Sequence, residues 1–283
     1  MDADQRVVAV TGATGRQGGA VARHLLSDGW RVRALTRKPQ GAAARRLATL
    51  GAQVVRADLA DVGALVQAFR GSHGVFSVQN PMISGVEAEV VHGRNVGDAA
   101  RKAGVRHVVY ASAGIDGRVT GVGSWDSKVR VQAYLEDLGV PLTVLRPVAF
   151  MELMTDSSFF PAVSTWHLMP KLAGETLPIA WISVDDVGAI AAIAFADPDR
   201  YVGAQLSLTA DVRSIAQCRD MWQAATGRRP RRFPLPIWMF ERFVGRDLTT
   251  MWRWLREANP SFDTASTRAI LPTAATVPQW LAR

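Results

Sequence analysis

One stretch near the start of the chain constrains the fold more than any other: residues 7–19 read VVAVTGATGRQGG. A β-branched run, typical of a buried parallel strand, opens it. Three glycines follow in a G-x-x-G-x-x-G spacing, at Gly12, Gly15 and Gly18, and apolar residues recur at helical spacing from Val21 onward. Glycines let the backbone turn sharply and approach a pyrophosphate, whose charge the first N–H groups of the helix receive. The pattern predicts a dinucleotide-binding turn; the alternative is a turn that joins strand and helix for purely steric reasons.

The end of the next apolar run, residues 32–35, indicates which dinucleotide the turn would bind. An NAD enzyme usually places an aspartate or glutamate there, to accept a hydrogen bond from the ribose 2′-hydroxyl. This chain has Arg37 and Lys38 instead, and Arg16 in the glycine turn offers a third cation. Guanidinium groups match the geometry of a phosphate, so the sequence predicts NADP(H), with its 2′-phosphate near these side chains. The alternative is a solvated basic loop, as runs of charges usually are.

Strands and helices alternate through the first half of the chain. After the first strand and helix, strands are expected at 32–35, 53–57, 75–78, 107–111 and 142–145, and helices at 42–50, 62–69, 86–103 and 126–138. Such alternation with short connections requires right-handed crossovers and a parallel sheet that is covered on both faces. The predicted class is α/β, a doubly wound parallel-sheet Rossmann fold. We expect an NADP-binding domain over residues 1–150, to which a strand and helix near 179–196 return.

The second half of the chain has a different composition, because prolines recur and tryptophans accumulate after residue 150. We expect residues 151–283 to form mainly a smaller α+β substrate cap. Within it, short strands are expected at 179–183 and 205–209, and helices at 184–195 and 215–225. One further continuous helix is expected from an apolar stripe at spacings of three and four: Ile237, Phe240, Val244, Leu248, Met251 and Leu255. Core packing explains that stripe, and a pocket wall or a partner face is the alternative.

The charge of the chain is basic, with a formal net charge of +8. A cluster of four arginines surrounds Pro230: Arg228, Arg229, Arg231 and Arg232. The other cations are dispersed, and no zinc-finger, RNP or basic-zipper pattern occurs, so the sequence argues against a nucleic-acid partner. A basic balance also suits a ligand that carries several phosphates.

The sequence indicates a reducing compartment, because its single cysteine, Cys218, excludes an intramolecular disulfide and a cysteine-based metal cluster. The histidines have no spacing typical of metal ligands, and no metal is predicted. The first residues, MDADQRV, are too polar and acidic for a secretory signal, and no apolar run approaches the ~18 residues of a membrane span. We therefore expect a cytoplasmic protein with no membrane partner; the sequence predicts no oligomeric state.

Several segments together resemble the NmrA-like group of atypical short-chain dehydrogenases/reductases. They are TGATGRQGG (11–19), LTRKP (35–39), ADLAD (57–61), VFSVQNP (75–81), YASAG (110–114), the lone Lys128 ahead of LGVPLTVLRP (138–147), and WISVDDVG (181–188). The resemblance covers nearly the whole chain and is most specific in its first two-thirds.

The resemblance implies a role for individual residues. Those of the glycine turn would hold the pyrophosphate and the adenosine phosphate: Gly12, Thr14, Gly15, Arg16, Gln17 and Gly18. Arg37 would meet the 2′-phosphate. Asp58 would lie by the adenine, with Leu59 packed on the ring, although an aspartate here also suits a helix cap. Residues 77–81 would line the nicotinamide ribose, through Ser77, Gln79 and Asn80; Asn80 before a proline also makes a turn by itself.

The catalytic pattern departs from that of the conventional dehydrogenase, in which a Tyr-x-x-x-Lys pair moves a proton while the nicotinamide moves a hydride. None of the tyrosines, Tyr110, Tyr134 and Tyr201, stands in that relation to a lysine, and Ser124 occupies the position four residues before Lys128. Ser112 is near the conventional serine position, although Ala113 fits the same place.

Lys128 is the remaining catalytic candidate. It could hold the ribose hydroxyls, or donate a proton as in the related isoflavone-reductase-like enzymes. The plain alternative is an exposed helix lysine.

Two functions follow from these residues. The first is an NADPH-dependent reductase of a small quinone or conjugated carbonyl, with a proton from Lys128 or water and an apolar substrate pocket. Candidates for that pocket, which are equally explained as core, are Met151, Met154, Phe159, Phe160 and Trp166. The second is a non-catalytic NADP(H) redox sensor that acts through a regulatory protein partner, as the resemblance allows; the missing tyrosine favours it.

Overall fold

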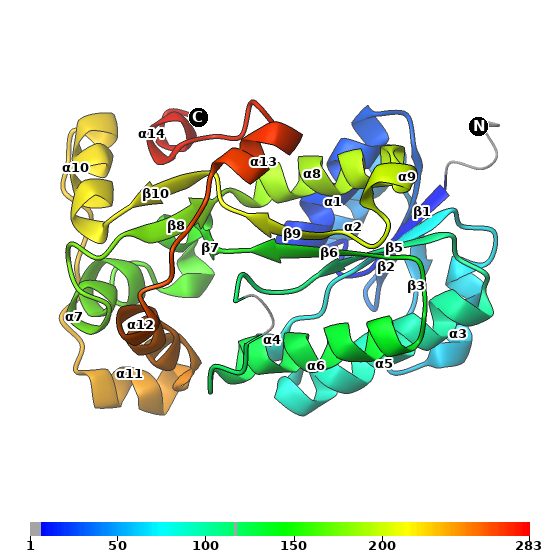
Figure 1. Cartoon of the computed structure of the whole chain (residues 1–283), viewed down its shortest axis with the longest axis horizontal. Coiled ribbons are helices and arrows are strands. Elements are labelled where there is room, and N and C mark those ends of the chain that lie inside the picture. The colour runs from blue at the N-terminus through cyan, green and yellow to red at the C-terminus, as the bar shows by residue number, and fades with distance from the viewer. Residues whose placement is uncertain (1–6, 116–117) are drawn as a thin grey trace. The chain divides into compact units, whose positions relative to one another are not determined.

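The computed structural model describes residues 7–115 and 118–283 (Figure 1). Contacts within the chain divide it into two compact units. Unit 1 takes the residues up to Arg118, then Ser124–Arg146 and Val184–Ser207, and unit 2 takes Val119–Gly123, Pro147–Ser183 and Leu208–Arg283.

Unit 1 is built on a parallel sheet with the strand order β3-β2-β1-β4-β5-β6-β9. The strands are β1 (Val7–Val10), β2 (Arg31–Thr36), β3 (Gln53–Arg56), β4 (Gly74–Ser77), β5 (His107–Ala111), β6 (Leu142–Pro147) and β9 (Gln205–Leu208). The strands predicted in the first half are all present, with ends shifted by a residue or two. This order is that of a Rossmann-like α/β fold, so the predicted fold class is confirmed.

The strand at 205–209 was expected in the substrate cap, and that expectation is wrong. Strand β9 is the edge strand of the main sheet, beside β6. Two backbone hydrogen bonds join the residues just before β9 to strand β6. The Gly203 N–H donates to the Leu142 carbonyl at 2.7 Å, and the Val144 N–H donates to the Ala204 carbonyl at 2.9 Å. The sequence of this segment, QLSL, does not indicate its partner strand, because strand pairing between distant residues leaves no local sequence pattern.

Helices cover both faces of this sheet (Figure 1). They are α1 (Arg16–Ser27), α2 (Ala42–Thr49), α3 (Val62–Phe69), α5 (Val86–Lys102), α6 (Gly123–Asp137) and α8 (Val184–Ala196), with short α4 (Pro81–Ser84) and α9 (Pro198–Tyr201) between them. Helices α1 and α8 lie on one face, and α3, α5 and α6 on the other. Apolar side chains from β1, β4, β5, α3, α5 and α6 form a continuous core that includes Leu65, Phe69 and Leu135.

Glycines allow the helices to pack closely. A Cβ on Gly188 of α8 would lie 2.8 Å from backbone and side-chain carbons of Ala20 in α1. On the other face, a Cβ on Gly93 of α5 would lie 2.5 Å from a methyl group of Val131 in α6. Real Cβ atoms do not tolerate such distances, so these glycines set the spacing of both helix pairs.

Unit 2 contains a three-stranded sheet with the order β10-β8-β7. The strands are β7 (Ala149–Phe150), β8 (Ile179–Ile182) and β10 (Asp211–Arg213); β8 is parallel to β7 and antiparallel to β10. The short 3₁₀-helices η2 (Met151–Met154) and η3 (Ser157–Phe159) and the π-helix η4 (Ser164–Leu168) follow β7. The helices are α7 (Met169–Leu172), α10 (Ile215–Thr226), α11 (Ile237–Val244), α12 (Asp247–Ala258), α13 (Ala265–Ile270) and α14 (Val277–Leu281).

The apolar stripe from Ile237 to Leu255 was expected to lie on one helix, and this is wrong. Two helices, α11 and α12, carry it, and they are separated at Gly245. Gly245 has a φ of 101°, which lies outside the range of an α-helix and which glycine adopts readily. Among the described residues, no helix combines the length and the apolar composition that a membrane crossing requires.

Candidate functional site

The glycine turn lies directly beside the carboxyl end of β4. Thr11, the first residue after β1, places its hydroxyl oxygen 3.1 Å from the carbonyl oxygens of Phe76 and Val78. The same oxygen accepts a hydrogen bond from the Val78 N–H at 2.9 Å. These contacts join the turn to the segment that follows β4, so two of the predicted ligand-binding segments meet at the carboxyl edge of the sheet, where parallel sheets bind their ligands.

The backbone of the turn explains two of its three glycines. Gly12 has a φ of +58°, in the left-handed region. A Cβ on Gly18 would lie 2.4 Å from the Gly12 carbonyl oxygen and 2.7 Å from that of Thr11. At Gly15 the same Gly12 oxygen would be 3.2 Å away, and the Gly15 N–H donates to it at 2.8 Å. The strand end therefore crosses over the first turn of α1 at a distance that only glycine permits.

Helix α1 begins without a side-chain cap at Gly15 and has no acidic residue in its first turn. Its first N–H groups and its positive dipole end are thus not neutralised by a side chain of the turn. Thr14 and Arg16 are exposed here, and Gln17 is half-buried with its Oε1 atom enclosed. Within the described chain that oxygen has no hydrogen-bond partner. This end of α1 has the properties of an anion-binding site.

Arg37 and Lys38 follow β2 at the same edge of the sheet. Both side chains are exposed. Neither side chain forms a hydrogen bond or an ion pair with any residue that the structure describes. The Lys38 backbone is bonded, with its N–H donating to Thr36 Oγ1 at 3.1 Å and its carbonyl accepting from the Gly41 N–H at 3.0 Å. Two cations that the protein leaves unneutralised at this position fit the predicted contact with a phosphate.

Asp58 and Leu59 follow β3. The exposed Asp58 carboxylate accepts only from the nearby Ala60 N–H, at 3.0 Å. The cap of α3 is Asp61, which accepts from the Ala64 N–H at 2.9 Å, so the helix-cap interpretation of Asp58 is wrong. Leu59 is partly buried against the core of unit 1.

The segment after β4 combines buried and exposed polar groups. Ser77 and Gln79 are buried, and Gln79 Nε2 donates to Ser77 Oγ at 3.0 Å. Gln79 Oε1 has no hydrogen-bond partner in the described chain. A buried acceptor without a donor is costly and marks a place where a ligand group could bond. Asn80 is exposed and caps α4 by accepting from the Met82 N–H at 2.9 Å, which is the turn role that its sequence context allows.

Lys128 lies at the centre of a buried polar cluster on unit 1. Its ammonium is 2.7 Å from Glu89 Oε1 and 3.3 Å from the Gln79 carbonyl oxygen. Only 12% of the Lys128 side chain is exposed, and Glu89 is fully buried. The hydroxyl of Ser127 donates to the other carboxylate oxygen of Glu89. The interpretation of Lys128 as an exposed helix lysine is therefore wrong.

Tyr110, on strand β5, contacts the same polar cluster. It is fully buried, and its hydroxyl donates to the Lys128 backbone carbonyl at 3.3 Å. Burial, and then the charge of Glu89, raise the pKa of Tyr110 well above its ordinary value. The phenol therefore stays protonated, and because it is buried with its hydroxyl bonded to a backbone carbonyl, it does not occupy the place of the acid–base tyrosine of the conventional dehydrogenase.

Sequence reasoning missed Glu89, although a signal was present. Helix α5 buries a stripe that includes Val90, Gly93, Val96 and Gly97. Glu89 lies on that apolar side of the helix, and a carboxylate there requires a partner. Counting polar residues on the buried stripe would have identified it.

The remaining predicted residues contact the protein itself. Ser112 is buried and donates to Gln132 Oε1 at 3.3 Å, which links β5 to α6. In unit 2, Met151, Met154 and Trp166 are buried, and Trp166 Nε1 donates to the Met154 carbonyl at 3.1 Å. Phe159 is partly buried. Phe160 is 50% exposed.

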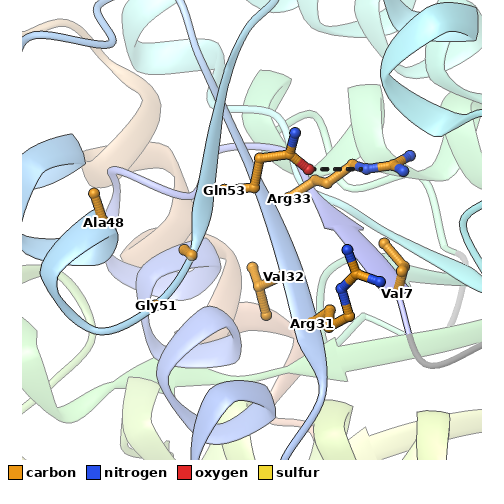
Figure 2. Close-up of a pocket in the computed structure, with 8 residues that line it drawn as sticks. Val7, Arg31, Val32, Arg33, Ala48, Gly51 and Gln53 are labelled. Atoms are coloured by element: carbon orange, nitrogen blue, oxygen red, sulfur yellow. Dashed lines mark hydrogen bonds between the residues drawn. The ribbon is translucent and has the colours of Figure 1, made fainter. Parts of the chain in front are cut away.

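A hollow of about 320 Å³ lies at the opposite edge of the sheet. Figure 2 shows the residues that line it. The hollow is lined by the amino-terminal ends of β1, β2 and β3 and by the end of α2. Arg33 donates there to Gln53 Oε1 at 3.3 Å, and also to the carbonyls of Ala68 and Arg70. Because ligands of doubly wound sheets bind at the carboxyl ends of the strands, we assign this hollow to packing rather than to ligand binding.

The chain matches known proteins along almost all of its length. The family model described as NmrA-like family matches residues 4–273. NmrA-like family domain-containing oxidoreductase malD of Malbranchea aurantiaca is 33% identical over 264 residues, which cover 84% of this chain and 78% of the relative.

Solved structures show the same fold. The NADPH-dependent quinone oxidoreductase QOR2 of Escherichia coli, complexed with NADPH, is similar with a TM-score of 0.79 at 23% identity, covering 97% of this chain and 98% of that one. NmrA, a negative transcriptional regulator, in complex with NADP, gives a TM-score of 0.76 at 21% identity, covering 99% of this chain and 95% of that one. The family match over residues 4–273, together with the 33% identical relative, leads to one conclusion: the chain belongs to the NmrA-like family.

Proposed function

We propose that the carboxyl edge of the unit 1 sheet binds NADP(H), and that the protein is an NADPH-dependent reductase of a small quinone or conjugated carbonyl. The observation that carries the proposal is the close passage of the Gly12 carbonyl over Gly18, which leaves the uncapped start of α1 free for a pyrophosphate. A turn that served only to connect strand and helix would not need this approach. The names of the relatives support the same reading, since they include oxidoreductases and an NADPH-dependent quinone oxidoreductase.

We assign each part of the cofactor to a different group of residues. The first turn of α1 would hold the pyrophosphate, together with Thr14, Gly15 and Gln17. Arg37 and Lys38 would hold the 2′-phosphate. Asp58 would accept from the adenine amine, and Leu59 would pack beside the ring.

The nicotinamide end would lie at Ser77, Gln79, Asn80 and Lys128. When bound, NADPH supplies a hydride, so the protein needs only to orient the acceptor, exclude water and provide a proton. Gln79 Oε1 offers an acceptor, and the Lys128 ammonium offers a hydrogen bond to a ribose hydroxyl or to the oxygen of the substrate. The proton that completes the reduction would come from Lys128 or from water.

Binding and turnover test the proposal separately. Purified protein is titrated with NADPH and with NADH by nicotinamide fluorescence, and NADPH oxidation is then followed at saturation with a panel of quinones and enones. We expect tighter binding of NADPH than of NADH, and turnover with at least one acceptor. Equal affinities for the two cofactors would contradict the NADP(H) assignment.

Replacing Arg37 with alanine is expected to weaken NADPH binding by about 10- to 100-fold, the effect of losing a hydrogen bond between charged groups, and to leave NADH binding unchanged. Arg31→Ala is the matched control. Arg31 is an exposed arginine at the other end of the same strand, so the net charge changes equally while the site does not. If both variants lose the same NADPH affinity, Arg37 acts only through the overall charge of the protein.

A redox sensor is the second candidate function. The observation that favours it is the placement of Tyr110, whose hydroxyl is committed to the Lys128 backbone carbonyl. Without an acid–base tyrosine beside Lys128, the site could bind NADP(H) and report its redox state to a protein partner. Tight NADPH binding with no oxidation by any acceptor of the panel would favour this function over the reductase.

A further inference from the structure

Glu89 and Lys128 form an ion pair that the protein has taken out of water. Glu89 comes from α5, and Lys128 from α6, with 2.7 Å between Oε1 and Nζ. Both oxygens of the carboxylate are used, because Ser127 donates to the second one. Removing charges from water is costly, and a buried ion pair often stabilises a fold no more than well-packed apolar side chains of similar volume. The pair therefore calls for an explanation other than stability.

Docking of α5 on α6 does not require this pair. The same two helices are joined at the surface by Glu87 and Arg130, in a two-pronged contact of 2.7 and 2.9 Å. Beneath it, the close approaches of Gly93 to Val131 and of Gly97 to Leu135 pack the helices together. The buried pair is thus additional to contacts that already hold the two helices in place.

The hydrogen bonds of the Lys128 ammonium give it a defined orientation. A lysine ammonium has three N–H donors. Within the described chain, one is directed to Glu89 Oε1 and one to the Gln79 carbonyl oxygen. These two acceptors fix the direction of the third N–H. The Gln79 carbonyl belongs to the segment that carries Ser77 and the unpartnered Gln79 Oε1, so the ammonium is bonded to the backbone of that segment.

We propose that Glu89 is a positioning residue: it holds the Lys128 ammonium against the Gln79 carbonyl so that the third N–H is presented to the nicotinamide-ribose end of NADP(H) or to the substrate oxygen. This inference rests on the proposed function. It assigns Glu89 no contact with cofactor or substrate. Ser127 acts with it, by fixing the second oxygen of the carboxylate.

Glu89→Gln keeps the shape of the side chain and removes its charge. We expect it to weaken NADPH binding about tenfold, the effect of misplacing one charge-assisted hydrogen bond, and to leave the affinity for 2′,5′-ADP unchanged. That fragment carries the 2′-phosphate but no nicotinamide, so it reports the adenosine half of the site alone. Both affinities are measured by calorimetry, and urea unfolding confirms that the variant is folded.

A double-variant cycle separates positioning from a general structural effect. If Glu89 acts through Lys128, then Glu89→Gln combined with Lys128→Met binds NADPH no more weakly than Lys128→Met alone. Glu87→Gln is the matched control on the same two helices, and we expect it to bind both ligands like the wild type.

Three outcomes would overturn the inference. They are an unchanged NADPH affinity in Glu89→Gln, an equal loss of 2′,5′-ADP affinity, and additive losses in the double variant. If Glu89→Gln does not fold, Ser127→Ala replaces it, with the same pattern expected at a smaller amplitude. A wild-type protein that binds 2′,5′-ADP but not NADPH overturns the assigned nicotinamide site, whereas one that binds neither overturns the proposed function itself.

Discussion

Replacing Gly18 with alanine is expected to abolish NADPH binding, with a loss of about 100-fold or more, and to lower the free energy of unfolding by about 1–3 kcal/mol. The added Cβ would lie 2.4 Å from the Gly12 oxygen, 2.6 Å from the Gly12 carbonyl carbon and 2.7 Å from the Thr11 oxygen. All three are backbone atoms, so no side-chain movement relieves the overlap. The turn must move away from α1, and the N–H groups at the start of the helix then lose their position relative to the pyrophosphate.

Gly15→Ala is the matched variant, because its Cβ would approach the same Gly12 oxygen at 3.2 Å. Gly15 has a φ of −92°, which alanine adopts without strain. We expect a small decrease in NADPH affinity and little change in the urea midpoint. If Gly15→Ala and Gly18→Ala bind NADPH equally well, the close passage over Gly18 is not what shapes the site.

Most of unit 1 could be predicted from sequence because its signals are local. A buried parallel strand reads as a short apolar run, as VVAV does in β1, and each helix that follows shows an apolar stripe. The parallel order then follows from right-handed crossovers rather than from any residue. The family resemblance that these segments carry is confirmed by the match over residues 4–273.

Two expectations about the fold failed for different reasons: one strand pairs with a partner that is distant in sequence, and one helix is interrupted at a single residue. Strand β9 pairs with β6 across a long interval, and nothing in QLSL identifies that partner. The break between α11 and α12 depends on one glycine, Gly245, within an apolar period that continues on both sides. Periodicity reports which face is apolar, and it does not report whether the backbone is continuous.

The candidate site could likewise be predicted only in part from the sequence. Position relative to the strand ends brought the glycine turn and residues 77–80 together correctly, since the Thr11 contacts join them. The surroundings of Lys128 could not be predicted in the same way, because Glu89 comes from another helix. A side chain that is read alone on one helix appears exposed, and only the packing of α5 against α6 buries it.

A second large effect concerns stability in acid, through histidines at the amino-terminal edge of the sheet. His107 is fully buried, and its Nε2 is 2.7 Å from Thr143 Oγ1. The Thr143 hydroxyl donates its proton to the Tyr201 carbonyl at 2.5 Å, so His107 must donate from Nε2. Its Nδ1 is enclosed and has no hydrogen-bond partner in the described chain. The Phe195 ring packs against the imidazole, with 5.3 Å between the two ring centroids. These surroundings favour the neutral imidazole form of His107 in the folded protein.

Burial, and then the nearby His73, lower the pKa of His107 to about 4, whereas a histidine of the unfolded chain titrates near 6.5. Between these values the unfolded state binds the proton and the folded state does not, so stability falls as the pH is lowered through 6.5 towards 4. We expect His107 alone to lower the free energy of unfolding by about 2 kcal/mol between pH 7.5 and pH 5.

Urea unfolding of the wild type and of His107→Gln at both pH values isolates this contribution, because every other titrating group is shared. Glutamine can still donate to Thr143 and carries no titrating group. The variant should therefore be less stable than the wild type at pH 7.5, where its imperfect packing is the only difference, and should lose less stability on acidification. Equal losses of stability in the two proteins would contradict the prediction, because they would mean that the folded state binds the proton on His107 as readily as the unfolded state does. The enclosed Nδ1 and the ring contact with Phe195 argue against such proton binding in the folded state.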